Sequence, residues 1–181
     1  MNIVFAVPGL STDSSSVEGK RARSIIKKCV KVVGKARIEP GAIVFTVGNA
    51  FDKRSPATKN ALALEALMKC LTDLDSLYLE LRASKGVLTP LLYDTPVYYE
   101  RTIVWDTIPA LYRRGFGDCK SLAACRVAEL RRMGIPCRVV FRFDSNVHMT
   151  MFHILVMHED GTFEDPSKVK GMIGPQELAN G

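Results

Sequence analysis

Apolar residues recur at helical spacing through SPATKNALALEALMKCLTDLDSLYLELRASKG, residues 55–86. Leucine, methionine and tyrosine occupy positions three and four apart, which is the period of a helix with one buried face. Ser55 suits the N-cap, Pro56 suits the first turn, and Gly86 suits the end of such a helix. The pattern predicts one long helix, with Cys70 packed beside its apolar stripe.

The N-terminal quarter combines strand and helix patterns. Two short apolar runs, NIVFAVPG at 2–9 and AIVFTVGN at 42–49, each end near glycine and predict strands. Between them, consecutive serines precede apolar positions at helical spacing, which predicts a capped helix. No residue in this part indicates chemistry. We therefore interpret residues 1–55 as an N-terminal appendage of two strands and a helix, ahead of a main domain at 56–175.

The second half of the chain alternates between helical and strand patterns. The proline-containing stretch 88–103 predicts an irregular or edge-strand connector. The stretch VWDTIPALYRRG then predicts a short helix that Gly115 ends, and a further helix is predicted at 118–133. Strands are predicted at about 137–143, 148–158 and 162–165. This order predicts an α+β fold, with one central helix packed on an antiparallel sheet.

Composition and charge narrow the class of protein. The 181 residues are 47% hydrophobic and 24% charged, which is typical of a folded domain. The net charge of +6 suits an anionic partner, but the basic residues are dispersed along helix faces without interleaved aromatic residues. We therefore do not expect nucleic-acid binding, which is the third alternative and would predict an affinity that falls steeply with salt. The apolar start MNIVFAVPGL is short and lacks basic residues, so we expect neither a signal peptide nor a membrane span.

The number and spacing of the cysteines do not indicate a disulfide framework. They are odd in number, and no CxxC pair is present, so the sequence predicts reduced thiols, no metal site and no cofactor. The five are Cys29, Cys70, Cys119, Cys125 and Cys137.

Cys119 occupies a position that favours reactivity. In GFGDCKSLAACRVAEL it follows two glycines and begins the predicted helix. The unpaired N–H groups and the dipole of a first helical turn lower a thiol pKa and can bind an oxyanion. Asp118 suits the N-cap, although its charge opposes thiolate formation. The alternative is that Cys119 packs against Leu122 and Ala123, as buried cysteines usually do.

The three histidines all fall in the strand HMTMFHILVMH, residues 148–158. Strand alternation separates His153 from His148 and His158 and leaves it in the middle of the other face. That face also carries methionine and leucine, so His153 is either a core residue or the base for Cys119. Its predicted neighbours on this face are Met149, Met151, Leu155 and Met157.

The hairpin register decides which acid orients His153. A two-residue turn at Asp160 and Gly161 would pair Asp165 with Val156, on the wrong face. A three-residue Glu159-Asp160-Gly161 loop, with a left-handed Gly161, would pair Asp165 with Leu155, on the face of His153. Asp165 would then lie within side-chain reach of His153. Glu164 is the fallback if the register differs.

These motifs resemble a known family when they are taken in order. GDCKSLAACRVAELRRMGIPCRVV, FHILV and DGTFEDPS resemble the transglutaminase-like superfamily of papain-like cysteine enzymes. With YYER, WDTIPALYRRGFGDC and DPSKVKGM included, residues 60–172 more closely resemble small transglutaminase-like proteins encoded among phage virion genes. The resemblance implies a transglutaminase/papain-like core. It also implies a triad of Cys119 as nucleophile, His153 as base and Asp165 as the acid that orients the base.

One departure from the family pattern bears on activity. The family often carries acidic residues directly after the cysteine, where this chain has Lys120 and Ser121. Non-catalytic members would drift in this way. Trp105, the single tryptophan, suits either a core role or a place lining the site.

The resemblance implies two functions. The first is cleavage or transfer at amide bonds of a protein or peptide substrate through a thioester, as a protease, an amidase or an acyltransferase. The alternative is a non-catalytic structural or assembly component of the phage virion that binds neighbouring virion proteins and keeps the fold. Either function implies a place in the host cytoplasm or in the virion.

Overall fold

A computed structural model describes residues 1–47, 57–146 and 149–173. The N-terminal part is an antiparallel sheet with a helix packed beside it. Its elements are β1 (Asn2–Ala6), α1 (Val17–Val33), β2 (Gly34–Glu39) and β3 (Ala42–Val47). The two predicted strands are thus confirmed as β1 and β3. Ser16 caps α1 by accepting a hydrogen bond from the Gly19 N–H at 2.9 Å. Strand β2, which was not predicted, extends the sheet on the far side of β3.

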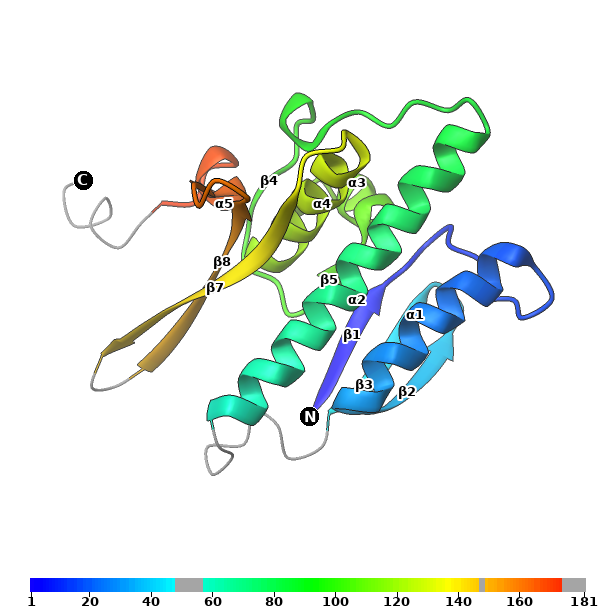
Figure 1. The fold of residues 1–181 in the computed structure, drawn as a ribbon, viewed down its shortest axis with the longest axis horizontal. Helices are drawn as coiled ribbons and strands as arrows, with labels where there is room; N and C mark the ends of the chain where they lie inside the picture. Colours follow the sequence, from blue (N-terminus) through cyan, green and yellow to red (C-terminus); the bar gives the residue numbers. More distant parts are fainter. Residues whose placement is uncertain (48–56, 147–148, 174–181) are drawn as a thin grey trace.

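The long helix α2 (Ala57–Ser84) confirms the strongest helical pattern of the sequence. Its predicted first residues, Ser55 and Pro56, lie outside the described residues. In Figure 1, α2 runs diagonally between α1 on one side and α4 on the other, and it packs against both. Its buried apolar side chains are Ala63, Leu64, Leu67, Met68, Cys70, Leu71, Leu74, Leu77 and Leu79.

A short parallel strand joins the N-terminal part to the rest of the molecule. Strand β5 (Trp105–Asp106) pairs with the end of β1, so the sheet has the order β2-β3-β1-β5. Phe5 stacks on Trp105 with ring centroids 5.3 Å apart. One apolar core includes residues of β1, α1, α2, α4 and β8. The predicted division at residue 55 and the predicted end at residue 175 lie outside the described residues, so this division stays a prediction.

The connector between α2 and α4 has little regular structure. It contains a short 3-10 helix (Leu92–Asp94), β4 (Tyr98–Tyr99), β5, α3 (Ile108–Arg114) and β6 (Phe116–Gly117). Strands β4 and β6 pair in parallel, which brings the connector alongside the residues just before Cys119.

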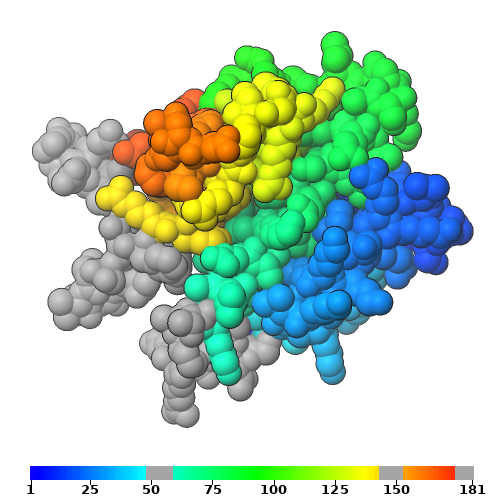
Figure 2. Space-filling view, in the orientation of Figure 1, coloured from blue at the N-terminus to red at the C-terminus, as the bar shows by residue number. Residues whose placement is uncertain are grey.

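The last part of the described chain places a helix on an antiparallel hairpin. It comprises α4 (Cys119–Arg132), β7 (Cys137–Asn146), β8 (Met149–His158), β9 (Phe163–Glu164) and α5 (Pro166–Val169). Strands β7, β8 and β9 form one antiparallel sheet, and α4 packs against β7 and β8. Figure 2 shows this half, in yellow and orange, on the side of α2 opposite the blue N-terminal part. The molecule is therefore a mixed α/β structure. None of the helices in the described ranges is long and apolar enough to span a membrane.

Candidate active site

Cys119 is the first residue of α4, and two glycines with different constraints precede it. Gly115 ends α3 with φ of 81°, a left-handed conformation that favours glycine. Gly117 is buried, and a Cβ at this position would lie 2.5 Å from a side-chain carbon of α3. The loop therefore turns sharply, lies close to α3, and delivers the thiol to the helix N-terminus.

The Cys119 thiol is partly buried, and burial raises its pKa above the ordinary value. Hydrogen bonds from the backbone N–H groups of Ile154 and Lys120 lower the pKa, whereas the Asp165 carboxylate raises it. The net effect is upward, so the helix terminus alone does not produce a thiolate, contrary to the expectation from position. The same contacts place the sulfur beside β8, at the residue that follows His153.

His153 is hydrogen-bonded to Asp165, the acid that the sequence predicted as its partner. Its Nε2 lies 2.8 Å from Asp165 Oδ2. The other carboxylate oxygen, Oδ1, accepts hydrogen bonds from the N–H groups of Ser167 at 3.1 Å and Lys168 at 3.2 Å, and thereby caps α5. Burial raises the pKa of Asp165, but these three hydrogen bonds outweigh it and hold the pKa below its usual value. Asp165 is therefore a fixed, ionised partner that leaves the Nδ1 of His153 for another group.

The register between β8 and β9 is the one that a three-residue loop requires. Val156 pairs with Glu164, and Gly161 in the intervening loop has φ of 83°. Continued by one residue, this register sets Asp165 opposite Leu155, two positions from His153. The three-residue alternative is thus confirmed, and the two-residue turn is excluded.

The fallback acid, Glu164, belongs to a different polar cluster. Its carboxylate accepts hydrogen bonds from Arg126 Nε at 2.6 Å and from the Tyr93 hydroxyl, and it lies 3.1 Å from His158 Nε2. Arg126 also stacks on the Tyr93 ring, with its guanidinium carbon 4.7 Å from the ring centroid. The two histidines of the described residues therefore have separate acidic partners: His153 bonds to Asp165, and His158 bonds to Glu164. His148 lies outside the described residues.

The face of β8 that carries His153 is not the one that packs into the core. Ile154 and Val156 are buried against α4, whereas the side chain of His153 is 22% exposed. Leu155 and Met157, which lie on the His153 face and suggested a core position, are half-buried, so this part of the face is partly open. Helix α4 covers the other face, and its N-terminus meets the strand beside His153.

Lys120, which breaks the family pattern, forms part of the immediate surroundings of Cys119. Its ammonium group pairs with the Asp118 carboxylate and donates a hydrogen bond to the Thr102 carbonyl oxygen at 2.9 Å. It also lies 5.7 Å from the centroid of the Trp105 ring. Burial lowers the pKa of Lys120 to about 8, although the charge of the buried Asp106 opposes this effect. The contacts with Thr102 and Trp105 leave no pattern in the sequence, because both residues belong to a connector that the fold brings to Lys120.

Ser121 and Trp105 have structural contacts. The Ser121 hydroxyl accepts a hydrogen bond from the Asp106 N–H at 2.9 Å, which fastens β5 to α4. Trp105 is 5% exposed and stacked on Phe5, so the core role is the one observed. In the described ranges, no group of three or more His, Cys, Asp or Glu side chains is arranged to hold a metal ion.

Comparison with known proteins gives one match. Residues 82–160 match the family model of the transglutaminase-like superfamily. The matched range includes Cys119 and His153 and ends before Asp165. No curated protein and no solved structure matches the chain. Over residues 82–160 the chain is thus similar to the transglutaminase-like superfamily, and its mixed α/β structure is consistent with a domain of that kind.

Proposed function

We propose that Cys119, His153 and Asp165 form a catalytic triad that acts on amide bonds of a protein or peptide through a thioester. The observation that carries this proposal is the 2.8 Å contact between His153 Nε2 and Asp165 Oδ2, beside the helix terminus that bears the thiol. Asp165 is held by its capping bonds to α5, so it can fix the orientation of the imidazole. The match of residues 82–160 to a family of transglutaminase-like proteins suggests cysteine-based catalysis at this place.

The first half of the reaction acylates the thiol. His153 accepts the thiol proton, and the sulfur attacks the amide carbonyl carbon to give a tetrahedral oxyanion. N–H groups at the first turn of α4 are the donors available to this oxyanion. The intermediate then expels the amine, which leaves with the proton from His153, and a thioester to Cys119 remains.

The second half releases the acyl group. A water molecule or a second amine attacks the thioester carbonyl, and His153 takes up the proton that the attacker loses. Collapse of this intermediate breaks the carbon–sulfur bond, and the departing sulfur recovers the proton. Water gives a carboxylic acid, as in a protease or an amidase, whereas an amine gives a new amide and therefore a cross-link.

The alternative function is a non-catalytic component of a phage virion that contacts neighbouring virion proteins. Two observations favour it. Burial keeps the pKa of Cys119 above that of an ordinary thiol. Lys120 stands where the family often carries an acid, and it is engaged with Asp118 and Thr102. A phage origin rests on the motif resemblance described above and is part of this proposal.

Alkylation of the native thiols separates the two functions. Iodoacetamide labelling is followed between about pH 5 and pH 9, with each cysteine quantified by mass spectrometry. If the triad operates, Cys119 is labelled faster than the other cysteines at neutral pH. Its labelling rate should fall at least about tenfold in His153→Ala, because the proton acceptor is lost.

A matched control is available on the same strand. His158→Ala removes a histidine that pairs with Glu164 rather than Asp165, and it should leave the labelling rate of Cys119 unchanged. Equal, slow labelling of Cys119 in wild type and in His153→Ala would refute the triad and favour the virion component.

A further inference from the structure

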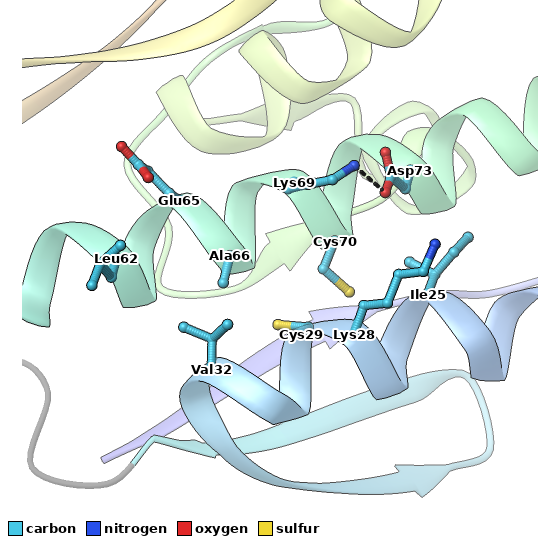
Figure 3. A pocket seen from close by; sticks show the side chains of 10 residues that line it. All are labelled: Ile25, Lys28, Cys29, Val32, Leu62, Glu65, Ala66, Lys69, Cys70 and Asp73. Atoms are coloured by element: carbon cyan, nitrogen blue, oxygen red, sulfur yellow. Dashed lines mark hydrogen bonds and ion pairs between the residues drawn. The ribbon is translucent and has the colours of Figure 1, made fainter.

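The interface between α1 and α2 forms a partly open cavity that no part of the proposed function uses. The cavity has a volume of about 280 Å³ and lies along one side of both helices. Figure 3 shows its lining side chains, which come from both helices. They are Ile25, Lys28, Cys29 and Val32 of α1, and Leu62, Glu65, Ala66, Lys69, Cys70 and Asp73 of α2.

Two thiols meet at the floor of this cavity. Cys29 is 3% exposed and Cys70 is 2% exposed, and both line the cavity. In Figure 3 both sulfur atoms lie in the space between the two helices. A hydrogen bond with the Cys29 thiol, together with burial, raises the pKa of Cys70. The two sulfurs are therefore direct neighbours, although they belong to different helices.

The other cysteines have partners of a different kind. Cys125 Sγ lies 3.7 Å from Glu129 Oε1 and 3.7 Å from the Tyr112 hydroxyl. Cys137 Sγ lies 3.8 Å from the Val127 carbonyl oxygen. Among the described residues, only Cys29 and Cys70 are recorded in contact with a second thiol.

We propose that Cys29 and Cys70 are a redox modification site, where a small hydroperoxide converts the thiol pair into a disulfide that links α1 to α2. A partly open cavity of about 280 Å³ is large enough to admit a small hydroperoxide. A disulfide requires two thiols on neighbouring backbones, and the packing of α1 against α2 supplies this arrangement. The site is separate from Cys119, and the proposal does not depend on the triad.

The chemistry is balanced with the hydroperoxide as the oxidant. One thiol gives up its proton, and its sulfur attacks a peroxide oxygen, which breaks the O–O bond and forms a sulfenic acid and one molecule of water or alcohol. The second thiol then attacks the sulfenic sulfur and displaces hydroxide, which leaves as water with the second thiol proton. Two thiols and one hydroperoxide thus yield one disulfide, one water and one water or alcohol. Each sulfur loses one electron, and the peroxide gains two.

The disulfide would bind the N-terminal sheet more firmly to the rest of the molecule. Cys29 lies in α1, which packs on β2 and β3, and Cys70 lies at the centre of α2. Closing this long loop of chain restricts the unfolded state, so the oxidised protein should unfold at a higher temperature than the reduced protein.

Peptide mapping of the full chain tests the proposal. The native protein is treated with hydrogen peroxide, its remaining thiols are blocked with N-ethylmaleimide in denaturant, and the unreduced digest is analysed by mass spectrometry. We expect a Cys29–Cys70 linked peptide as the main product. It should disappear on treatment with dithiothreitol, and the thermal midpoint should fall at the same time.

The controls use the remaining thiols. Cys70→Ser should abolish the linked peptide, whereas Cys125→Ser, which removes another fully buried thiol, should leave it unchanged. Because a substitution can perturb folding, the wild-type chain is also oxidised in urea, where pairing should lose its preference for Cys29 with Cys70. The proposal is overturned if Cys29 and Cys70 of the native protein remain alkylatable under peroxide, or if they carry sulfinic acid instead of the link. A linked peptide in Cys119→Ser would show that the result is independent of the candidate active site.

Discussion

Asp118 and Lys120 flank the cysteine with opposite charges. Asp118 is needed as the N-cap of α4, because its carboxylate accepts a hydrogen bond from a first-turn N–H. Its negative charge, so near to Cys119, disfavours a thiolate. The Lys120 ammonium pairs with the same carboxylate and offsets that charge. The lysine that departs from the family pattern is therefore compatible with a reactive thiol.

We predict that Lys120→Met slows alkylation of Cys119 about tenfold at neutral pH, because an uncompensated charge at this range shifts a pKa by about one unit. Lys120→Arg keeps the positive charge and should retain most of the rate. In an Asp118→Asn background the charge to be offset is absent, so adding Lys120→Met should have little further effect. Equal losses in both backgrounds would mean that Lys120 acts on the thiol in another way. Single-cysteine labelling rates from mass spectrometry provide the measurement.

At the scale of elements, Asp165 connects three parts of the fold. It follows β9, caps α5 through Oδ1 and bonds to His153 on β8 through Oδ2. The length of the loop between β8 and β9 determines whether Asp165 can reach His153, because a shift of one residue in the register would turn the carboxylate to the other face of the sheet. The two oxygens therefore serve different purposes, one structural and one directed at the site.

Substitutions at Asp165 should separate these two purposes. Asp165→Asn keeps an oxygen for the α5 cap but removes the charge that faces His153, whereas Asp165→Ala removes both. We expect Ala to lower the free energy of unfolding by about 1 kcal/mol more than Asn does, which is the usual value of an N-cap. Both variants should slow Cys119 alkylation to a similar extent. Urea unfolding and labelling rates test the two expectations separately, and equal stabilities would show that the cap contributes little.

The elements and contacts that the sequence predicted correctly are those with local causes. The start of α4 follows from Asp118, and the partner of His153 follows from loop length and strand alternation. Strand β2 was missed because GKARIE offers only two apolar positions, Ala36 and Ile38, which are too few to predict a strand. The parallel pairing of β5 with β1 was missed because a two-residue strand that pairs over a long sequence distance leaves no periodic pattern. The surroundings of Cys119 were missed for the same reason, since Thr102 reaches Lys120 through the fold of the connector.

At the scale of the whole molecule, buried acids lie where α2, α3 and α4 meet. Asp75 on α2 is fully buried, and its Oδ1 accepts a hydrogen bond from the Ile108 N–H at 2.7 Å, at the start of α3. Burial raises the pKa of Asp75 far above its usual value, and the charges of Glu129 and Asp106 raise it further. Burial likewise raises the pKa of Glu129 and of Asp106. The pKa values of the acids at this junction are therefore shifted upward, whereas those of Glu164 and Asp165 are shifted downward.

These opposite shifts determine how stability depends on pH. A carboxyl group whose pKa is raised in the folded state holds its proton more tightly there than in the unfolded chain. It therefore lowers the free energy of unfolding as pH rises from about 4 towards the folded pKa, by up to about 1.4 kcal/mol per pH unit. Groups with lowered pKa act in the other direction, because their stabilisation is complete above the unfolded pKa and is lost as pH falls through the folded pKa. We therefore expect maximal stability at mildly acidic pH, with a decline towards neutral pH that depends on Asp75.

Asp75→Asn tests this dependence directly. The amide oxygen can still accept the hydrogen bond from Ile108, but it cannot ionise, so the free energy of unfolding should vary less between about pH 5 and pH 8 than in wild type. Asp73→Asn, on the same helix but paired with Lys69 at the surface, is the matched control and should retain the wild-type slope. Urea denaturation at each pH gives the slopes. If Asp75→Asn and Asp73→Asn have the same slope, Asp75 carries the same charge in the folded and the unfolded chain over this range, so it is ionised in the folded protein and the pH dependence arises elsewhere. In that case the Ile108 N–H at the start of α3 donates its hydrogen bond to a buried carboxylate, and not to a protonated carboxyl group.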